Sequence, residues 1–316
     1  MRTILVTGGA GFIGSHVSES LLRHGHRVAI VDNLDDFYSP ELKRLNLEEI
    51  RGVGTYDFFP VDIRDLEKLR EVIEAVRPHS IIHLAARAGV RPSLLQPEAY
   101  VRTNVVGTLN LLELARTYHV SQFVFASSSS VYGQANRVPF SESDPILKPL
   151  SVYAVTKVSG EALAFTYAHL YDLPVICVRI FTAFGPRQRP DLAIRKFAHL
   201  IASGQEIPIF GDGSMQRDYT YIDDVTEALE LALEYKCAFE VFNLGNSRPI
   251  RLDYLVRVLE EAIGVKARVK HYPAQPGDME ITYADLSKSR QCLGYEPKVG
   301  FEEGIRRFVE WFRNSP

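Results

Sequence analysis

The sequence lacks the features that mark secreted, membrane-spanning and metal-binding proteins. It has three cysteines in 316 residues, an odd number with no Cys-x-x-Cys pair, so we expect no disulfide framework and a reducing compartment. No apolar run is long enough to span a bilayer, and the first one is broken at once by glycines, unlike a signal peptide. The nine histidines show no metal-ligand spacing. We therefore predict a cytoplasmic protein with no membrane partner and no metal.

An excess of charge of either sign is also absent. The chain has 36 Lys and Arg against 39 Asp and Glu, a formal net charge of -3, which gives no reason to expect nucleic acid as a partner. Internal repeats and low-complexity tracts are missing too. What is present is a hydrophobic content of 46%, which over this length is enough for one large α/β unit or for two lobes.

The N-terminal stretch has the pattern of a dinucleotide-binding unit. An apolar strand over residues 2–7 leads into the glycine loop of residues 8–14, a helix, a second strand over 28–31 and then Asp32. Glycines let the backbone approach a pyrophosphate, and the helix N-terminus supplies N–H donors to it. The terminal carboxylate suits the ribose of NAD and disfavours the phosphate of NADP. The alternative is a tight strand-to-helix turn that binds nothing.

The preference for NAD over NADP is less decisive than the dinucleotide site itself. Lys43 and Arg44 follow Asp32 closely enough in the chain to reach the same region, where a cation would favour the phosphate of NADP. We expect NAD as the cofactor because the carboxylate occupies the position directly after the strand.

Strands and helices continue to alternate along the rest of the chain. Further strands are predicted over residues 56–61, 81–86, 122–126, 175–180 and 241–244, and helices over residues 39–50, 65–76, 97–118, 153–170, 223–234, 252–263 and 301–313, with Asp223 and Asp224 capping the helix that ends at 234. This alternation predicts a parallel sheet with helices on both faces, and ligands then bind beyond the carboxyl ends of the strands.

A hydroxyl group, a phenol and an amine are placed to form one proton-transfer device. Ser128 follows the strand predicted over 122–126, and Tyr153 and Lys157 lie four residues apart on one helix face. A nearby ammonium group favours the phenolate, so we expect Lys157 to lower the pKa of Tyr153. Tyr-x-x-x-Lys alone occurs in many ordinary amphipathic helices, and it is the dinucleotide-binding pattern that favours a catalytic role here.

These motifs together resemble the extended short-chain dehydrogenase/reductase family over nearly the full chain. Within it, four stretches resemble the nucleotide-sugar epimerases and dehydratases: Asp32-Asn33-Leu34, Val131-Tyr132-Gly133, Arg217-Asp218-Tyr219 and Gly277-Asp278. The resemblance implies an α/β fold, a Rossmann-type doubly wound parallel sheet with a smaller interleaved C-terminal substrate-binding lobe. It implies an NAD-binding domain over residues 1–180, with 215–250 returning to it, and a nucleotide-sugar lobe mainly over 181–316.

The serine run distinguishes branches of this family. Family 4,6-dehydratases have an Asp-Glu pair where this chain has Ser129 and Ser130, and family decarboxylases have a Glu in place of Ser130. The chain thus has the residues for hydride transfer without the extra carboxylates. This combination implies an epimerase, which needs only oxidation of the sugar, rotation of the keto intermediate and reduction from the other face.

Four stretches resemble the UDP-glucuronate 4-epimerases in particular: 88–93, the serine run, 181–191 and 275–278. UDP-glucose 4-epimerases typically have Asn at the place of Thr182 and Arg at that of Gln275. A uronate carries a carboxylate that Arg189 could hold with two charge-assisted hydrogen bonds. With Ser129 and Ser130, this grip would keep the 4-keto acid from losing CO₂. Alternatives are another 4-epimerase, for UDP-glucose or an N-acetylated uronate, and a non-catalytic NAD-binding scaffold.

The resemblance also implies the roles of individual residues. Tyr153 is the expected base at the C4 hydroxyl, Ser128 orients the C4 oxygen, and Lys157 holds the cofactor ribose. The expected NAD-binding residues are Gly8, Gly11, Phe12, Ile13, Gly14, Asp32, Asn33, Lys43, Asp62, Ile63, Leu84, Ala85, Ala86, Asn104, Tyr153, Lys157 and Phe181. The expected UDP-sugar-binding residues are Arg87, Ser128, Ser129, Ser130, Thr182, Arg189, Pro208, Phe210, Arg217 and Asp278.

Several of these substrate residues have a structural alternative. Arg217 would also suit a surface ion pair with Asp212 or Asp218. The stretch 207–210, expected against uracil, would also suit an ordinary edge strand. Asp278, expected at the uridine ribose, would also suit a turn after Pro-Gly.

Two long helices carry apolar stripes that suggest a homodimer. The stripes are Val101, Val105, Leu109 and Leu112 on the helix of 97–118, and Leu163, Tyr167 and Leu170 on the helix of 153–170. The family commonly pairs these helices across a dimer axis as a four-helix bundle. The alternative is that both helices only cover the sheet.

Overall fold

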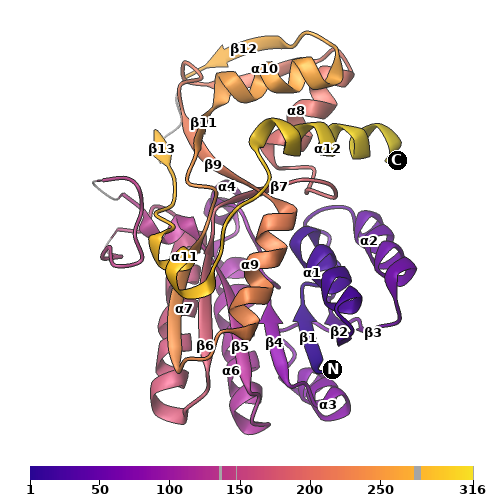
Figure 1. Ribbon diagram of the computed structural model, residues 1–316, viewed down its shortest axis with the longest axis vertical. Coiled ribbons are helices and arrows are strands. Elements are labelled where there is room, and N and C mark those ends of the chain that lie inside the picture. Colours follow the sequence, from indigo (N-terminus) through magenta and orange to yellow (C-terminus); the bar gives the residue numbers. More distant parts are fainter. Residues whose placement is uncertain (135–136, 147, 274–278, 316) are drawn as a thin grey trace.

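The computed structural model describes residues 1–134, 137–146, 148–273 and 279–315 (Figure 1). Seven parallel strands form its main sheet, in the order β10-β6-β5-β4-β1-β2-β3. They are β1 (Thr3–Thr7), β2 (Arg27–Val31), β3 (Asp57–Phe59), β4 (Ser80–His83), β5 (Gln122–Ser128), β6 (Val175–Ile180) and β10 (Phe239–Leu244). This is the doubly wound, Rossmann-type parallel sheet that the alternating pattern predicts.

Helices cover both faces of this sheet because its central strands are apolar on both sides. Ile4 and Val6 of β1 belong to one core with α1 (Phe12–Arg23) and α9 (Ile222–Glu234). Leu5, between them, belongs to a second core with α3 (Leu66–Val76), α6 (Gly107–Thr117) and α7 (Val152–Tyr171). The helix α2 (Pro40–Val53) packs on α1 at the edge of the sheet (Figure 1).

The helix predicted over residues 97–118 is not one regular α-helix. It consists of α5 (Pro97–Tyr100), a π-helical segment η1 (Val101–Val106) and α6. Asn104, in the π-helical segment, is buried and turned toward the protein interior. A π-helical turn adds a residue to the helical repeat, and such turns are frequent at functional sites.

A second group of elements lies beyond the carboxyl ends of the main strands, at the top of Figure 1. It comprises β7 (Thr182–Phe184), α8 (Ala193–Ala202), β8 (Glu206–Phe210), β9 (Gln216–Tyr221), β11 (Pro249–Arg251), α10 (Leu252–Ile263), β12 (Arg268–Tyr272), β13 (Ile281–Thr282) and α12 (Phe301–Asn314). The chain returns from this group to the main sheet through α9 and β10, and then leaves again by way of β11.

Some predicted boundaries are wrong. The strand predicted over 56–61 is β3, only three residues at the sheet edge, and that predicted over 81–86 ends at His83. Asp223 and Asp224 do not cap α9; they lie in its first turn. The Asp224 carboxylate instead accepts hydrogen bonds from the N–H groups of Lys298 and Val299, at 2.8 and 3.2 Å. Tertiary contact therefore decides the use of this side chain.

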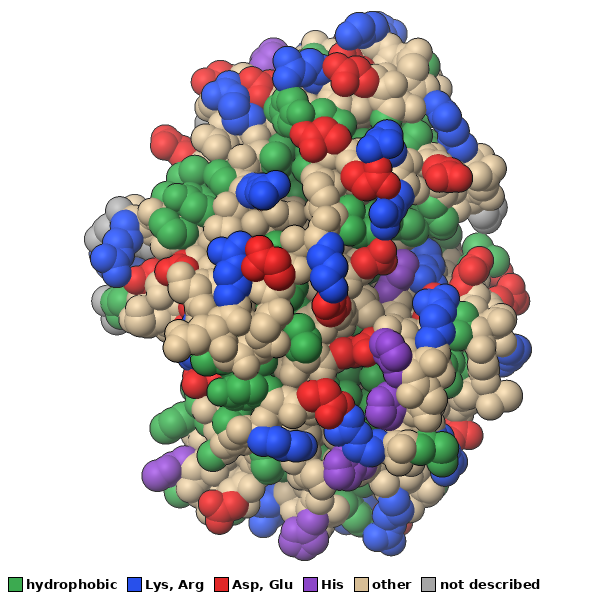
Figure 2. All heavy atoms as spheres, in the orientation of Figure 1, with side chains coloured by type: hydrophobic (Ala, Val, Ile, Leu, Met, Phe, Trp, Pro, Cys, Tyr) green, Lys and Arg blue, Asp and Glu red, His purple; other side chains and the backbone are tan. Residues whose placement is uncertain are grey.

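Charges of both signs are interspersed over the face shown in Figure 2, with no broad area of one sign. Among the described residues, no helix is long and apolar enough to cross a membrane.

Candidate active site

A cavity of about 480 Å³ opens at the carboxyl ends of the main strands. It brings together most of the predicted site residues, although they come from distant parts of the chain. Those lining it are Gly8, Gly11, Phe12, Ile13, Gly14, Asp32, Asn33, Lys43, Asp62, Ile63, Leu84, Ala85, Ala86, Arg87, Ser128, Ser129, Ser130, Tyr153, Lys157, Phe181, Thr182 and Arg189. Parallel strands end at the same edge of a sheet, which explains why residues that follow them meet.

The glycine loop is a close-packed turn between β1 and α1. Gly8 has a φ of 71°, and a Cβ there would lie 2.7 Å from the backbone nitrogen of Ala85. A Cβ at Gly14 would lie 2.2 Å from the carbonyl oxygen of Gly8. Larger residues would therefore push the loop away from the sheet and fill the space in front of the α1 N-terminus. The loop fits the diphosphate of a dinucleotide, which such a helix N-terminus attracts.

Asp32 lies at the end of β2, as predicted, and is 8% exposed. Its carboxylate accepts hydrogen bonds from the N–H groups of Ala10, at 3.1 Å, and Leu34, at 2.9 Å. Burial raises the pKa of Asp32, and the ammonium group of Lys43 opposes that shift. Lys43 donates to the carbonyl of Asp35 at 2.5 Å, whereas Arg44 pairs with Glu41 on the surface. Of the two downstream cations, only Lys43 thus reaches this region.

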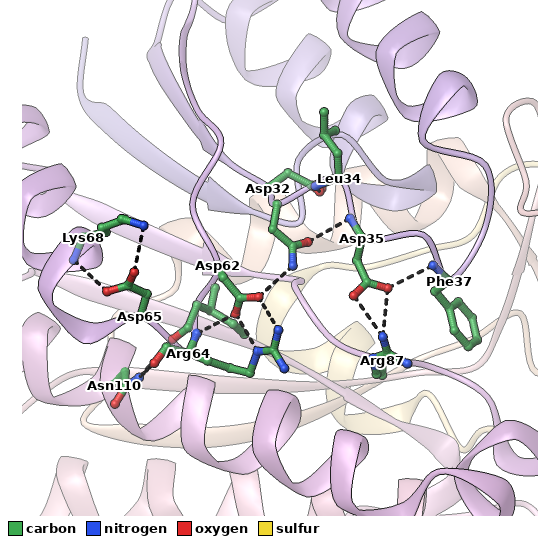
Figure 3. Close-up of polar contacts among 12 residues, drawn as sticks. Asp32, Leu34, Asp35, Phe37, Asp62, Arg64, Asp65, Lys68, Arg87 and Asn110 are labelled. Atoms are coloured by element: carbon green, nitrogen blue, oxygen red, sulfur yellow. Dashed lines mark hydrogen bonds and ion pairs between the residues drawn. The ribbon is translucent and has the colours of Figure 1, made fainter.

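Asp62 follows β3 and lines the same cavity. Figure 3 shows that its carboxylate faces Arg64. The Arg64 guanidinium donates to it at 2.9 and 2.6 Å, and the Asn33 amide at 2.8 Å. This carboxylate, predicted to bind NAD, is therefore already held by two side chains of the protein.

Ser128, Tyr153 and Lys157 come together where β5 meets α7. A hydrogen bond with Ser128 and the charge of Arg189 favour the phenolate of Tyr153, but burial outweighs both and raises its pKa. Burial lowers the pKa of Lys157 to about 8. The Lys157 ammonium donates to the carbonyl of Ala126 at 2.5 Å and lies 6.0 Å from the Tyr153 ring centroid. The prediction that Lys157 lowers the pKa of Tyr153 is therefore wrong for this structure, because burial dominates and Arg189 is the cation that acts on the phenol.

A buried ion pair lies beneath this set, one helical turn after Lys157. Glu161 of α7 accepts two hydrogen bonds from Arg179 of β6, at 3.0 and 2.8 Å, and one from Ser127, at 2.5 Å. The Arg179 guanidinium also donates to the Tyr132 hydroxyl at 3.0 Å. The network joins the end of β5, the turn after the serine run and α7. Sequence reasoning missed it, although Glu161 continues the four-residue spacing of Tyr153 and Lys157.

Asn104 does not line the cavity, contrary to its prediction as a cofactor residue. Its amide group holds the backbone of Arg87, accepting from its N–H at 2.8 Å and donating to its carbonyl at 2.9 Å. It also donates to the Thr156 hydroxyl at 3.0 Å. Asn104 thus acts on the cavity wall through Arg87, and the π-helical turn is what points it inward.

A chain of neutral polar groups continues from this turn to β1. The Thr108 hydroxyl donates to the carbonyl of Asn104 at 2.6 Å, so it accepts from Nε2–H of His83 at 2.9 Å. Nδ1 of His83 then accepts from the Thr7 hydroxyl at 2.7 Å. Burial lowers the pKa of His83 to about 3, so the ring is neutral at physiological pH. The chain fixes the ends of β1 and β4 beneath the cavity.

Arg87 and Arg189, both predicted to face substrate, lie over the same aromatic ring. Their guanidinium carbons are 5.9 and 5.3 Å from the ring centroid of Phe37. Arg87 pairs with Asp35 at 3.0 and 3.1 Å (Figure 3), and Arg189 with Asp191 at 2.7 and 3.0 Å. Each of these two lining arginines therefore already has a carboxylate partner.

Three predicted substrate residues in the described part of the chain do not line this cavity. Pro208 and Phe210 lie on β8 of the second group, and the Arg217 guanidinium donates to the carbonyls of Gln216 and Met279, at 2.8 and 2.7 Å. The Arg91 guanidinium lies over the ring of Phe210, 5.0 Å from its centroid, and connects the two regions. Asp278 lies outside the described residues, as does Gln275.

Sequence reasoning also missed the segment that follows Asp32. Asp35, Phe37 and Tyr38 line the cavity, and the Tyr38 hydroxyl is buried with no hydrogen-bond partner. A Cβ at Gly11 would lie 3.8 Å from that hydroxyl oxygen, so it faces the glycine loop. The available signal was an aromatic pair in an otherwise polar stretch after the strand.

Comparison with known proteins gives one family and a group of full-length relatives. The sequence profile of the family described as GDP-mannose 4,6 dehydratase matches residues 5–308. A UDP-glucuronate 4-epimerase of Thermodesulfobacterium geofontis is 43% identical over 317 residues, covering 100% of this chain and 97% of that protein.

Two solved structures extend this comparison. UDP-glucuronic acid 4-epimerase from Bacillus cereus, in complex with UDP-glucuronic acid and NAD, is 34% identical with a TM-score of 0.92, and 99% of each chain is covered. UDP-glucose 4-epimerase from Thermotoga maritima, with UDP-glucose, is 36% identical with a TM-score of 0.91 and the same coverage. Overall similarity therefore does not separate a uronate from a neutral sugar.

Proposed function

The chain belongs to the family described as GDP-mannose 4,6 dehydratase, and we propose that it is an NAD-dependent 4-epimerase that interconverts UDP-glucuronic acid and UDP-galacturonic acid. The observation that carries this proposal is that Ser128, Tyr153 and Arg189 line one cavity with the glycine loop. A proton-transfer set, a cation suited to a carboxylate and a dinucleotide cradle are thereby placed around one substrate. The full-length UDP-glucuronate 4-epimerase relative supports the same conclusion.

The residues that fit NAD are those of the glycine loop, Asp32 and Lys157. When bound, NAD supplies the hydride acceptor for C4 and later the hydride donor for the opposite face of the sugar. Asp32, buried at the end of β2, would accept hydrogen bonds from the adenosine ribose. Lys157 would hold the second ribose. Because the hydride must return to the same sugar, we expect NAD to stay bound through the cycle.

Tyr153 moves the proton at the C4 oxygen. Burial raises the pKa of Tyr153, and the hydrogen bond with Ser128 and the charge of Arg189 oppose that shift. Ser128 orients the same oxygen. In the return step the Tyr153 hydroxyl gives the proton back as the C4 oxygen becomes a hydroxyl again.

The serine run selects epimerisation over elimination or loss of CO₂. Ser129 and Ser130 stand where related dehydratases and decarboxylases have carboxylates, so the cavity offers hydroxyl groups beside C4 and C6. The 4-keto uronate is a β-keto acid and loses CO₂ when its carboxylate is free to align. Arg189 and the two serines hold that carboxylate in another orientation while the ring turns.

We assign the UDP part to the second lobe. Residues 1–180 form the NAD-binding domain together with α9 and β10. The predicted returning stretch 215–250 is longer than this, because β9 and β11 at its two ends belong to the second group of elements, and 181–316 otherwise form the nucleotide-sugar lobe. Phe210 and Pro208 pack on uracil, Arg217 binds the diphosphate and Asp278 binds the uridine ribose. The stacking of Arg91 on Phe210 supports this, because it joins the predicted uracil platform to the cavity.

We further propose a homodimer through α7 and the η1–α6 helix. The prediction of Leu112 and Tyr167 in the apolar stripes is wrong, because both side chains are buried in the core and cannot contact a second subunit. Val101, Leu109, Phe165 and Leu170 are exposed by 36 to 59% and form the apolar surface instead. Sedimentation of a concentration-independent monomer would contradict this proposal. The cytoplasmic location stays a prediction from cysteine usage.

A second candidate is a UDP-glucose 4-epimerase. Asp191 already neutralises Arg189, so a sugar without a carboxylate would not leave a bare charge in the cavity. An N-acetylated uronate remains a further possible substrate. A non-catalytic scaffold is disfavoured by the assembled Ser128, Tyr153 and Lys157.

The test is an NMR time course with UDP-glucuronic acid and no added cofactor. Appearance of UDP-galacturonic acid without a UDP-pentose is the expected result and also shows that NAD copurifies. Conversion of UDP-glucose alone would keep the mechanism and overturn the uronate assignment. No turnover of any UDP-sugar after addition of NAD would overturn the enzymatic proposal.

A further inference from the structure

Arg189 lines the cavity, and its side chain is much less exposed to solvent than that of its partner Asp191. Nε and Nη2 of Arg189 donate to Oδ1 and Oδ2 of Asp191, at 3.0 and 2.7 Å. The Arg189 side chain is 15% exposed, whereas that of Asp191 is 43% exposed. The guanidinium is thus enclosed by the protein, while water reaches the carboxylate from outside.

The same local geometry occurs elsewhere in the chain without a cavity. Arg251 and Asp253 are also two residues apart, and Nε and Nη2 of Arg251 donate at the same 3.0 and 2.7 Å. Both of these side chains are about half exposed, at 51 and 50%. A two-residue Arg–Asp spacing therefore forms this pair by itself, and what distinguishes Arg189 is its burial beside the proton-transfer set.

Arg189 is held in place by more than Asp191. Its guanidinium lies over Phe37, and its charge acts on Tyr153. The preceding Arg187 pairs with Glu19 of α1 and contacts His16, so the loop is fixed to the helix that follows the glycine loop. If Asp191 turned away, the guanidinium would keep its position and its charge, but it would lack a counter-charge.

From this arrangement we propose that Asp191 is a specificity-determining residue: an exchangeable counter-ion that the carboxylate of the substrate displaces from Arg189. The inference rests on the proposed function, because it requires that C6 of the sugar lies at Arg189. Displacement is inexpensive for Asp191, since water can solvate its exposed carboxylate. For Arg189 the exchange keeps two charge-assisted hydrogen bonds, now made to the substrate.

This counter-ion reduces the difference in Kd between a uronate and a neutral sugar. A uronate must compete with Asp191, which reduces its affinity. A neutral hexose leaves the pair intact, so it meets a compensated arginine and not a buried bare charge, which would be unfavourable. Removing the Asp191 charge should therefore strengthen binding of the uronate and weaken binding of the neutral sugar.

The test is equilibrium titration of the NAD-loaded protein with UDP-glucuronic acid, UDP-glucose and UDP. The measurements use the Tyr153→Phe background, so that no substrate is converted during the titration. For Asp191→Asn we expect the ratio of the UDP-glucose Kd to the UDP-glucuronic acid Kd to rise at least fivefold. Asp191→Ser is a second variant with the same expectation. Asp253→Asn is the matched control, for which the ratio should not change.

The double variant Arg189→Ala/Asp191→Asn separates exchange from a general effect on the loop. The reference for this variant is Arg189→Ala. Without the arginine, removal of the aspartate should no longer change the ratio of the two Kd values, because the two residues act on the substrate only as a pair. A ratio within twofold of the parent in both Asp191 variants would overturn the proposal. It would also be overturned if Asp191→Asn changed the ratio by the same factor in the presence and in the absence of Arg189.

The outcomes also separate this inference from the proposed function. If the ratio rises while the otherwise unaltered enzyme converts no UDP-sugar, the epimerase proposal fails and the counter-ion stands. If UDP-glucuronic acid is epimerised while the ratio stays unchanged in Asp191→Asn, the function stands and the counter-ion proposal fails.

Discussion

Two of the arginine–carboxylate pairs near the cavity differ in what surrounds them. Arg179 and Glu161 come from β6 and α7, are 5 and 8% exposed, and share further hydrogen bonds with Ser127 and Tyr132. Arg189 and Asp191 come from one loop, and only the arginine is enclosed. The first pair is closed on all sides, whereas the second is open to water on its carboxylate side.

The difference shows how one kind of ion pair serves two purposes. Breaking a buried pair leaves an uncompensated charge with no water to solvate it, so the pair holds the structure in one arrangement. A pair with one exposed member exchanges its partner at small cost. The floor of the cavity is accordingly fixed by Arg179 and Glu161, while the wall at Arg189 can respond to a ligand.

The largest effect is expected from breaking the buried pair. Arg179→Met should lower the free energy of unfolding by about 4 kcal/mol, because Glu161 is left charged and buried. Urea denaturation measures this. The double variant Arg179→Met/Glu161→Leu should recover most of the loss. Arg251→Met, which breaks an exposed pair, should leave the denaturation midpoint nearly unchanged, and an equal loss in both single variants would contradict the comparison.

Tyr153→Phe tests proton transfer at the C4 oxygen without changing Arg189 or the serine run. Removal of the hydroxyl should lower kcat about 10³-fold, within the range for a general acid–base group. The Kd of UDP-glucuronic acid should change little, because Arg189 and the serine run remain. Single-turnover kinetics and titration separate the two quantities. A large loss of affinity with normal kcat would show that Tyr153 binds substrate and does not transfer the proton.

His83 differs from the pair of Arg179 and Glu161, because it is buried in its neutral form, and this makes stability depend on pH. Its folded-state pKa of about 3 lies below the ordinary value of 6.5, so the unfolded chain takes up a proton first as the pH falls. Stability present above pH 6.5 is therefore lost below it, by about 2 kcal/mol at pH 5. Urea denaturation at pH 7.5 and 5 measures the loss. His83→Gln should remove about this much of the difference, and an unchanged pH dependence would contradict the neutral-ring assignment.

The smallest effect is expected at Phe37, because only its ring contacts with Arg87 and Arg189 are lost. Phe37→Ala removes the aromatic face under Arg87 and Arg189, and each such contact is worth roughly 0.5–1 kcal/mol. We expect KM for UDP-glucuronic acid to rise about threefold with kcat nearly unchanged. Phe37→Leu keeps the apolar volume, so a loss of the same size in that variant shows that the π face is what matters. A kcat loss as large as that of Tyr153→Phe would place Phe37 in the chemistry.

The sequence predicts those parts of the site whose residues directly follow a strand. The glycine loop, Asp32 and the serine run each follow a strand, and parallel strands end at one edge, so local patterns were enough to bring them together. Asn104 shows where this reasoning stops. Its place in a helix was read correctly, but a π-helical turn points it at the backbone of Arg87, and nothing in local propensity indicates such a turn.

The charged residues show the same division. The sequence identified Arg189 as a cation for substrate, yet its pairing with Asp191 and its stacking on Phe37 depend on which loops meet. Likewise the pKa of Tyr153 depends on burial and on Arg189, and not on the helical neighbour Lys157. Electrostatic environments arise from the full surroundings of a group, which spacing along one helix does not contain.

By itself, the sequence determined the alternating α/β fold, the dinucleotide loop and the Ser128, Tyr153 and Lys157 set, because each follows from hydrophobic periodicity and short-range spacing. Only the tertiary structure decided which charges are buried, which carboxylate each arginine meets and which of the predicted residues line the cavity. The physical reason is that strand order and helix periodicity are local properties of the chain, whereas solvent exclusion and ion pairing depend on segments far apart in sequence that meet only in the folded protein.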